Sequence, residues 1–354
     1  MNTNEKYIAR CIELARNGLG TSYPNPLVGS VIVYDNKIIG EGWHRRAGEP
    51  HAEVNAINSV KDKSLIKKAT IYVSLEPCSH FGKTPPCCDF IIKNKIPNVV
   101  VGTVDPNVKV AGNGIKKLIE AGVKVTVGVL EDECNELNKR FFTFHQKKRP
   151  YIILKWAESQ DGYIAPDATF RKKLNHNEKK PVWITSPYSR QLVHKWRSEE
   201  QAILVGTQTV IDDNPKLDVR NWTGNNPIRL VLDTNNRIPS NSHIFDNQAE
   251  TIIFTKIIGN IDKEKLIFDI IGFGKNIASQ LSEAMHRHQI QSVIIEGGRQ
   301  TLQTFIDANL WDEARIFSGN TIFTQGISAP TLPESYRKKK LIGQDELIIS
   351  RNHD

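Results

Sequence analysis

Short runs of branched, apolar residues alternate with helix-like segments along almost the whole chain. The first part contains the strand-like runs GSVIVY, TIYVSL (70–75), NVVVGTV (98–104) and VKVTVGV. The second part contains YIILKWA, AILVG (202–206), IRLVLDT (228–234), ETIIFT (250–255) and SVIIEGG (292–298). The segments between them have apolar residues at helical spacing. Because alternating strands and helices build a sheet covered by helices, we expect a three-layer α/β fold.

The chain has room for two domains, because 354 residues is about twice the length of a typical domain. A break falls in FHQKKRPY (144–151), where basic residues precede a proline and a new strand. We therefore predict one α/β domain over 1–146 and a second over 150–354. Within the second domain, the polar segment 166–181 predicts a loop.

The stretch EPHAEVNAI (49–57) places a histidine and a glutamate two residues apart, just after a proline. Pro50 suits the first turn of a helix, because its missing N–H would have no partner there. The apolar residues that follow can supply a buried helix face. In a first turn, both His51 and Glu53 can reach a group beyond the helix end, so the stretch predicts a site at a helix N-terminus.

Two cysteines later in the chain suggest what that site holds. Cys78 follows a strand, and Cys87 begins a helical pattern, where the helix N-terminus favours a thiolate. His51, Cys78 and Cys87 are ligands that suit Zn²⁺, and three ligands leave the fourth tetrahedral position for water. Glu53 would then take a proton from that water and pass it to a leaving amine. The sequence therefore predicts a catalytic zinc centre with Glu53 as the proton carrier.

The pattern H-x-E followed by P-C and a second cysteine is the signature of zinc nucleobase deaminases. Here the second cysteine lies nine positions after the first, whereas the signature places it three positions on. The alternatives are a structural zinc site closed by His80 or Cys88, or no metal at all. Cys88 fits better as a packed neighbour than as a ligand. Cys11 and Cys134 lie on helical patterns and are expected to be buried and inert.

Charge and composition limit the partners. The net charge is +8, with basic clusters at 146–150, 171–173, 179–180 and 337–340 that are either solvated surface or attractive to phosphate groups. Aromatic residues are not interleaved regularly with these clusters, so we expect no nucleic-acid partner. No apolar run approaches the roughly 18 to 20 residues of a membrane span, so we expect no membrane partner. The N-terminus is not signal-like and the cysteine count is odd, which favours a cytoplasmic location.

Four longer segments of the first part form a recognisable set, namely YPNPLVGSVIV (23–33), GWHRRAGEPHAEVNAI (42–57), YVSLEPCSHFGKTPPCCDFII (72–92) and VDPNVKVAGNGIKKLIEAG (104–122). In these segments the chain resembles the bifunctional riboflavin-biosynthesis deaminase–reductase family. The extended Cys–Cys segment with GKTPPC separates this family from cytidine and tRNA-adenosine deaminases. The resemblance implies a cytidine-deaminase-like domain that removes the 2-amino group of a diaminopyrimidinone ribosylamino phosphate. It also implies that Asn25 and Lys83 contact this substrate.

The second part resembles the reductase half of the same family through segments within 153–165, 183–220, 228–234 and 294–302. This resemblance implies a dihydrofolate-reductase-like fold that uses NADPH to reduce the ribosyl group to ribityl. The residues that would border NADPH are Ala157, Trp183, Thr209, Asp213, Thr234, Gly298, Arg299, Gln300 and Thr301. The residues that would hold the substrate are Lys155, Arg197, Leu217, Arg220 and Glu296.

The two arginines of that substrate set have a specific expected role. Arg197 and Arg220 face no obvious acidic partner in the sequence, and a guanidinium group suits phosphate by bidentate geometry. We therefore expect at least one of them to grip the substrate phosphate.

Two rival functions remain open from the sequence. One is a zinc deaminase of nucleic acid or free nucleobases, with a second domain that binds without catalysis. The other is a zinc-stabilised binding module without catalysis, for which Glu53 would be dispensable. The expected partner is a small phosphorylated pyrimidine, and the sequence leaves a homo-oligomer open.

Overall fold

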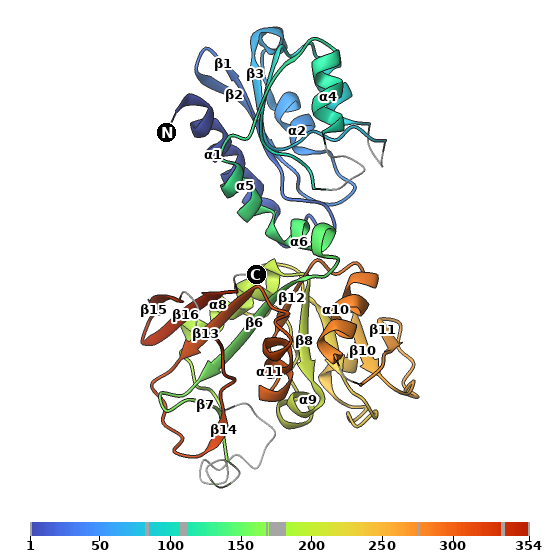
Figure 1. The fold of residues 1–354 in the computed structure, drawn as a ribbon, viewed down its shortest axis with the longest axis vertical. Helices are drawn as coiled ribbons and strands as arrows, with labels where there is room; N and C mark the ends of the chain where they lie inside the picture. The colour runs from blue at the N-terminus through green and yellow to red at the C-terminus, as the bar shows by residue number, and fades with distance from the viewer. Residues whose placement is uncertain are drawn as a thin grey trace. The chain divides into compact units, whose positions relative to one another are not determined.

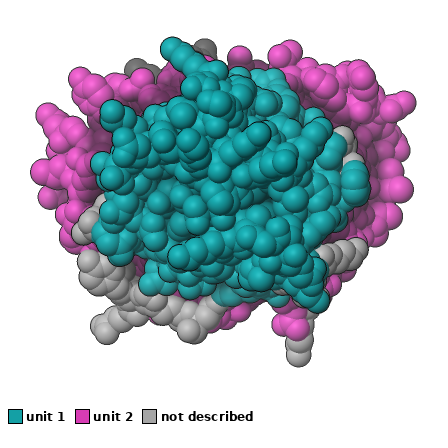
Figure 2. Space-filling view, turned by 90° about the horizontal axis from the view of Figure 1, so that it is seen from above, with its two compact units in different colours: residues 1–148 teal, residues 149–354 magenta. Residues whose placement is uncertain are grey.

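The computed structural model describes residues 2–81, 85–106, 112–167, 169, 182–274, 276–333 and 337–352. The chain divides into two compact units, Met1–Lys148 and Arg149–Asp354 (Figures 1 and 2). This division falls within the stretch 144–151, where basic residues precede Pro150. Among the described residues, no helix combines the length and the apolar character that crossing a bilayer requires.

Unit 1 is built on a five-stranded sheet in the order β2-β1-β3-β4-β5. Its strands are β1 (Gly29–Tyr34), β2 (Lys37–Trp43), β3 (Thr70–Leu75), β4 (Asn98–Thr103) and β5 (Lys124–Val127). β1 pairs antiparallel with β2 and β3, whereas β3, β4 and β5 are parallel. Asp35 and Asn36 join β1 to β2 with φ angles of 49° and 57°, as a two-residue hairpin turn requires.

Helices cover both faces of this sheet (Figure 1). They are α1 (Thr3–Ala15), α2 (Ala52–Ser59), α3 (Cys87–Lys93), α4 (Asn113–Glu120), α5 (Glu131–Leu137) and α6 (Lys139–Lys147). α2, α3 and α4 share a buried core with Ile32 and Ile71, whereas α1 and α5 share a core with Val31 and Tyr72. Because successive strand residues point to opposite faces, each strand feeds both cores. The predicted three-layer arrangement is confirmed for this unit.

Unit 2 contains a nine-stranded sheet in the order β11-β10-β9-β8-β12-β6-β13-β16-β15. Its strands are β6 (Tyr151–Glu158), β8 (Ala202–Gly206), β9 (Ile228–Leu232), β10 (Thr251–Thr255), β11 (Leu266–Ile270), β12 (Ser292–Ile295), β13 (Glu313–Ser318), β15 (Arg337–Ile342) and β16 (Asp345–Arg351). Neighbours are parallel, except that β16 pairs antiparallel with β13 and β15. A separate small sheet pairs β7 (Tyr163–Pro166) with β14 (Gly326–Ser328).

The helices of unit 2 also lie on both faces of its main sheet. They are α8 (Pro187–Glu199), α9 (Thr207–Asp213), α10 (Ile277–Arg287) and α11 (Arg299–Asp307). α10 and α11 share the largest core, whereas α8 packs Trp196 against Phe317 on the other face. The five strands predicted in this unit are confirmed, and six strands were missed, namely β7, β11, β13, β14, β15 and β16. β15 is a basic strand at an exposed sheet edge, where charged residues block further pairing, so its sequence lacks an apolar signal.

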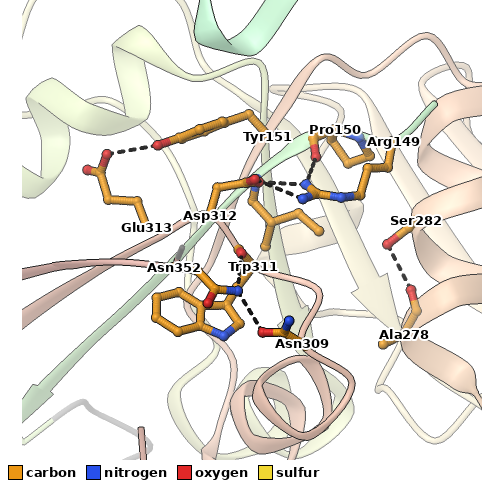
Figure 3. A network of polar contacts seen from close by, with 11 residues as sticks. Arg149, Pro150, Tyr151, Ala278, Ser282, Asn309, Trp311, Asp312, Glu313 and Asn352 are labelled. Carbon is orange, nitrogen blue, oxygen red and sulfur yellow. Dashed lines mark hydrogen bonds and ion pairs between the residues drawn. The ribbon is translucent and has the colours of Figure 1, made fainter. Parts of the chain in front are cut away.

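A buried ion pair fixes the start of unit 2 (Figure 3). The Arg149 guanidinium donates to both carboxylate oxygens of Asp312, at 2.6 and 2.8 Å, and to the Pro150 carbonyl at 3.0 Å. The backbone N–H of Ile152 donates to the same carboxylate at 2.8 Å. The basic cluster 146–150 was interpreted as solvated surface or a phosphate attractor, and for Arg149 both interpretations are wrong. Its charge is instead neutralised inside the unit.

Candidate functional site

The first group of predicted site residues gathers where α2 begins. His51 is the N-cap of this helix, with φ −71° and ψ 168°, and Glu53 is the second helical residue. Pro50 lies before the N-cap, so the prediction that it occupies the first turn is wrong. The extended backbone of His51 directs its ring away from the helix, towards two cysteine sulfurs. Glu53 is buried beside them.

The loop after β3 and the first residue of α3 supply those sulfurs. The Nδ1 atom of His51 lies 3.5 Å from the Cys78 Sγ and 3.3 Å from the Cys87 Sγ. The backbone N–H of Cys87 donates to the Cys78 Sγ at 3.3 Å, so the start of α3 stabilises negative charge on that sulfur. The ligand atoms of these three residues all lie within 4.8 Å of one another. This convergence is compact enough for one metal ion.

Neither of the two alternative ligands belongs to this three-residue group. His80 is exposed, and Cys88 is fully buried in the core shared by α2, α3 and α4. The Cys88 sulfur lies 3.8 Å from an Asp89 carboxylate oxygen. Cys11 and Cys134 are buried, as predicted from their helical patterns.

The three-residue group concentrates negative charge on sulfur. The Cys87 thiol donates to Cys78 and thereby lowers the pKa of Cys78 to about 4. The same hydrogen bond and burial raise the pKa of Cys87, so the pair holds one proton in the absence of a cation. The hydrogen bond with Cys78 raises the pKa of His51. Burial, followed by the charge on Cys78, raises the pKa of Glu53 to about 7, which lets this carboxyl hold or release a proton near neutral pH.

His44 is a residue of this site to which the sequence assigned no role. It lies just after β2, and its ring packs edge-on against the His51 ring at a centroid distance of 5.2 Å. The Asn25 side-chain amide donates to His44 Nε2 at 2.9 Å, so the proton of the neutral ring lies on Nδ1, 3.3 Å from the Pro50 carbonyl. Burial lowers the pKa of His44 and favours this neutral ring. Asn25 therefore reaches the site through His44. Lys83 lies outside the described residues.

The second group of predicted residues surrounds a cavity of about 880 Å³ in unit 2. It lies at the carboxyl ends of β8 and β9 and at the start of α11. Six of the predicted cofactor residues line it, namely Thr209, Thr234, Gly298, Arg299, Gln300 and Thr301. Ala157, Trp183 and Asp213 are not among its lining residues. Arg237 lines it as well, although no motif in the sequence pointed to this residue.

Backbone contacts hold the walls of this cavity close together. The N–H of Gly298, the N-cap of α11, donates to the Thr209 hydroxyl at 3.1 Å. A Cβ atom on Gly297 would lie 3.1 Å from the Gly206 nitrogen, so a side chain there would separate the two turns. The first residues of α11, Arg299, Gln300 and Thr301, line the cavity, and the unpaired N–H groups of a helix N-terminus suit phosphate oxygens.

An ionic cluster joins three of the predicted substrate residues. Arg197 donates to both carboxylate oxygens of Glu296, at 3.2 and 2.8 Å, and Lys155 Nζ lies 4.0 Å from the same carboxylate. The expectation that Arg197 has no acidic partner is therefore wrong. Burial would raise the pKa of Glu296, but the charges of Arg197 and Lys155 outweigh it and lower this pKa to about 2. Burial lowers the pKa of Lys155.

The loop that carries Leu217 and Arg220 lies next to this cluster. Arg197 and the ring of His194 both contact the Asp218 carbonyl, at 3.3 and 2.9 Å. Leu217 is buried with a left-handed φ of 53°. Arg220 is exposed and pairs with the adjacent Asp218 carboxylate at 2.6 Å, so it too has an acidic partner, contrary to the expectation from the sequence. The guanidinium of Arg220 therefore stays accessible to solvent, whereas the guanidinium of Arg197 is largely enclosed.

Comparisons with known proteins find relatives for both units of the chain. Residues 1–103 match the model of the cytidine and deoxycytidylate deaminase zinc-binding region, and residues 150–343 match that of the RibD C-terminal domain. The chain is 40% identical over 368 residues to the riboflavin biosynthesis protein RibD of Aquifex aeolicus, with 99% of each chain covered. It is 37% identical over 331 residues to RibD of Escherichia coli, covering 89% of this chain and 87% of that protein.

A solved structure extends the agreement to the whole fold. The crystal structure of a diaminohydroxyphosphoribosylaminopyrimidine deaminase/5-amino-6-(5-phosphoribosylamino)uracil reductase from Thermotoga maritima matches with a TM-score of 0.88 at 35% identity, covering 99% of both chains. Unit 1 is thus a deaminase domain of the cytidine-deaminase type and unit 2 a RibD-type reductase domain. The chain belongs to the RibD family, the bifunctional deaminase–reductases of riboflavin biosynthesis.

Proposed function

We propose that unit 1 removes the 2-amino group of 2,5-diamino-6-ribosylamino-4(3H)-pyrimidinone 5′-phosphate, using one Zn²⁺ held by His51, Cys78 and Cys87. The observation that carries this proposal is the convergence of three ligand atoms within 4.8 Å beside a buried carboxyl group. One imidazole and two sulfur ligands fit Zn²⁺ and leave one tetrahedral position open. The Thermotoga maritima relative is named for deamination of a pyrimidine of this class.

Each residue of unit 1 has a separate role in this proposal. Bound Zn²⁺ would supply the Lewis acidity that makes a water molecule nucleophilic at neutral pH. Glu53 accepts a proton from that water and delivers it to the departing amino group, because its carboxyl group is buried beside the three ligands. His44 orients the His51 ring through the edge-on contact of the two rings, and Asn25 fixes the tautomer of His44 through its hydrogen bond to Nε2.

The metal assignment is tested by zinc analysis of three proteins. The parent protein should contain about one zinc per chain, as a single three-ligand site requires. Cys87→Ser should lose most of it, whereas Cys88→Ser should retain it, because Cys88 is packed in the apolar core. Full retention in Cys87→Ser would contradict the proposed ligand set.

We further propose that unit 2 reduces the ribosyl group of the deaminated product to ribityl with NADPH bound in the 880 Å³ cavity. The cavity offers helix N–H groups at α11 for a diphosphate, and Arg237 and Arg299 for further negative charge. Bound NADPH would supply the hydride. Lys155 is a buried cation whose lowered pKa suits proton donation near the reacting carbon.

The substrate phosphate is assigned to Arg220 in this proposal. Arg197 already forms two hydrogen bonds with Glu296, so its part is to orient that carboxylate and, through the Asp218 carbonyl, the loop of Leu217 and Arg220. The guanidinium of Arg220 is accessible and can exchange the partly exposed Asp218 carboxylate for a phosphate group.

Chelation tests whether the two activities use separate sites. A zinc chelator should abolish ammonia release and leave NADPH-dependent reduction of the deaminated product unchanged, because the proposed zinc ligands lie in unit 1 and the cavity in unit 2. Loss of both activities on chelation would contradict the two-site proposal.

The partner in this proposal is a small phosphorylated pyrimidine, without nucleic acid. A cytoplasmic location is part of the same proposal, because the five cysteines, all of them described, are not in disulfides, as is usual in a reducing compartment. A homo-oligomer stays a prediction.

A further inference from the structure

Glu76, the residue two positions before the ligand Cys78, carries an extensive set of contacts that the proposed reaction does not use. Its carboxylate is buried and accepts hydrogen bonds from four backbone N–H groups. The donors are Asp105 at 3.3 Å, Gly112 at 2.9 Å, Gly114 at 2.9 Å and Ile115 at 3.3 Å. One side chain therefore joins the end of β3, the loop after β4 and the first turn of α4.

These contacts replace the missing cap of α4. The N-cap of this helix is Gly112, in the left-handed conformation with φ 74° and without a side chain that could accept a hydrogen bond. The first N–H groups of a helix have no partner within the helix, and they favour a negative charge. Because Glu76 comes from another part of the chain, the cap also fixes where the end of β3 lies relative to α4.

The backbone of the same segment is fixed from two further sides. The N–H of Glu76 donates to the Thr103 carbonyl of β4 at 2.9 Å. A Cβ atom on Gly114 would lie only 2.0 Å from the Pro77 carbonyl oxygen, so α4 presses directly on the residue before Cys78. The segment Glu76–Pro77 thus has little freedom to move, and Cys78 follows it.

From these contacts, we propose that Glu76 is a positioning residue of the metal centre, which sets the place of the Cys78 sulfur by locking its loop to α4. The inference rests on the proposed zinc ligands. It also gives the segment VDPNVKVAGNG (104–114) a role, because the described residues at its two ends supply three of the four donors. Outer groups that orient metal ligands typically change metal affinity by 10- to 100-fold when they are substituted.

The test measures zinc affinity in the full-length protein, by competition with a chromogenic chelator. Glu76→Gln keeps the shape of the side chain but presents an NH₂ group to N–H donors, so it should raise the zinc Kd by roughly 10- to 100-fold. The matched control is Ser30→Ala, which removes a buried hydrogen bond of 2.8 Å to the Tyr72 carbonyl elsewhere in unit 1. Ser30→Ala should leave the zinc Kd within about twofold.

A spectroscopic readout separates positioning from general stability. Co²⁺ bound at the site should show a changed visible absorption band in Glu76→Gln and an unchanged band in Ser30→Ala. If Glu76→Gln fails to fold, Gly114→Ala perturbs the same junction from the α4 side with the carboxylate intact, and it should also weaken zinc binding. The inference would be overturned if Glu76→Gln had the zinc Kd and the Co²⁺ spectrum of the parent protein. If only Gly114→Ala folds, the same result in that variant would overturn it. Absence of zinc from the parent protein, or its retention in Cys87→Ser, would instead overturn the proposed ligand set.

Discussion

The three-residue group of unit 1 and the cavity of unit 2 are built from stretches of chain that differ greatly in length. The three proposed ligands of unit 1 come from a 37-residue stretch, 51–87, and their ligand atoms lie within 4.8 Å of one another. The lining of the unit 2 cavity extends from Gly206 to Ile327 and encloses about 880 Å³. In the proposed function, a few atoms of unit 1 carry out the deamination, whereas many residues of unit 2 share the binding of the cofactor. Single substitutions should therefore have larger effects on activity in unit 1.

Glu53→Gln is expected to have the largest effect. The amide keeps the shape of the side chain but cannot carry a proton between water and amine, so deamination should fall by about 10²- to 10⁴-fold. Ammonia release measures this loss, and zinc content checks that the site is intact. Glu49→Gln, at an exposed position nearby, is the matched control and should be close to the parent. Near-normal deamination by Glu53→Gln would contradict the expectation that single substitutions affect activity more strongly in unit 1 than in unit 2.

Arg197→Ala should have the largest effect on the stability of unit 2. It leaves the Glu296 carboxylate buried without its main partner, which typically costs about 3 to 5 kcal/mol in free energy of unfolding. Arg220→Ala breaks an exposed pair and should cost at most about 1 kcal/mol. Denaturant unfolding followed by tryptophan fluorescence reports mainly on unit 2, which holds five of the six tryptophans. Equal losses in the two variants would argue against a structural role for the Arg197–Glu296 pair.

A fall in pH should lower the free energy of unfolding of unit 2, because it protonates the Glu296 carboxylate. The folded-state pKa of Glu296 is about 2, below the ordinary 4.5, so its ionised form stabilises the fold above about pH 4.5. This contribution, about 3 kcal/mol, is lost as the pH falls towards 2. The difference in free energy of unfolding between the parent and Glu296→Gln should accordingly shrink from pH 5 to pH 2. A constant difference would contradict the lowered pKa.

In zinc-free protein, Glu53 should give unit 1 the opposite pH dependence. Its pKa rises to about 7 on folding, so the folded state binds the proton more tightly than the unfolded state. The contribution of Glu53 to stability should be largest below about pH 4.5 and should be lost as the pH rises towards 7. Thermal unfolding of the zinc-free protein between pH 4 and pH 8 measures it, with Glu53→Gln as the reference that lacks the titrating group.

The smallest expected effect concerns the cofactor. Arg237 lines the cavity and is exposed, with its loop held by the Asp233 carboxylate through the N–H groups of Arg237 and Ile238. If it meets the additional phosphate of NADPH, Arg237→Gln should raise the Kd for NADPH by about 10-fold and leave that for NADH unchanged. Arg287→Gln, an exposed arginine of α10 outside the cavity lining, is the control. Equal weakening of both cofactors would contradict this role.

The difference between the units also explains what the sequence could predict. His51, Cys78 and Cys87 belong to short motifs whose spacing already limits where their side chains can lie. The partnership of Arg197 with Glu296 joins residues 99 positions apart, and that of Glu76 with Ile115 joins residues 39 apart. Such contacts depend on which strands and helices become neighbours, and local spacing carries no information about that. The same reason explains why the sequence assigned no role to His44, although this residue lies in the motif 42–57. The contact between its ring and the His51 ring is visible only in the structure.

The Arg149–Asp312 pair decides where the gene can be divided into separate halves. A reductase fragment that starts at Pro150 would lack the guanidinium that holds Asp312 in Figure 3. Of the three hydrogen bonds to the Asp312 carboxylate, only that from the Ile152 N–H would remain. A fragment that starts at Lys148 would keep the pair. The two fragments differ by two residues, yet only the longer one should express as a stable protein, so any natural or engineered split of the two activities should leave Arg149 with the reductase.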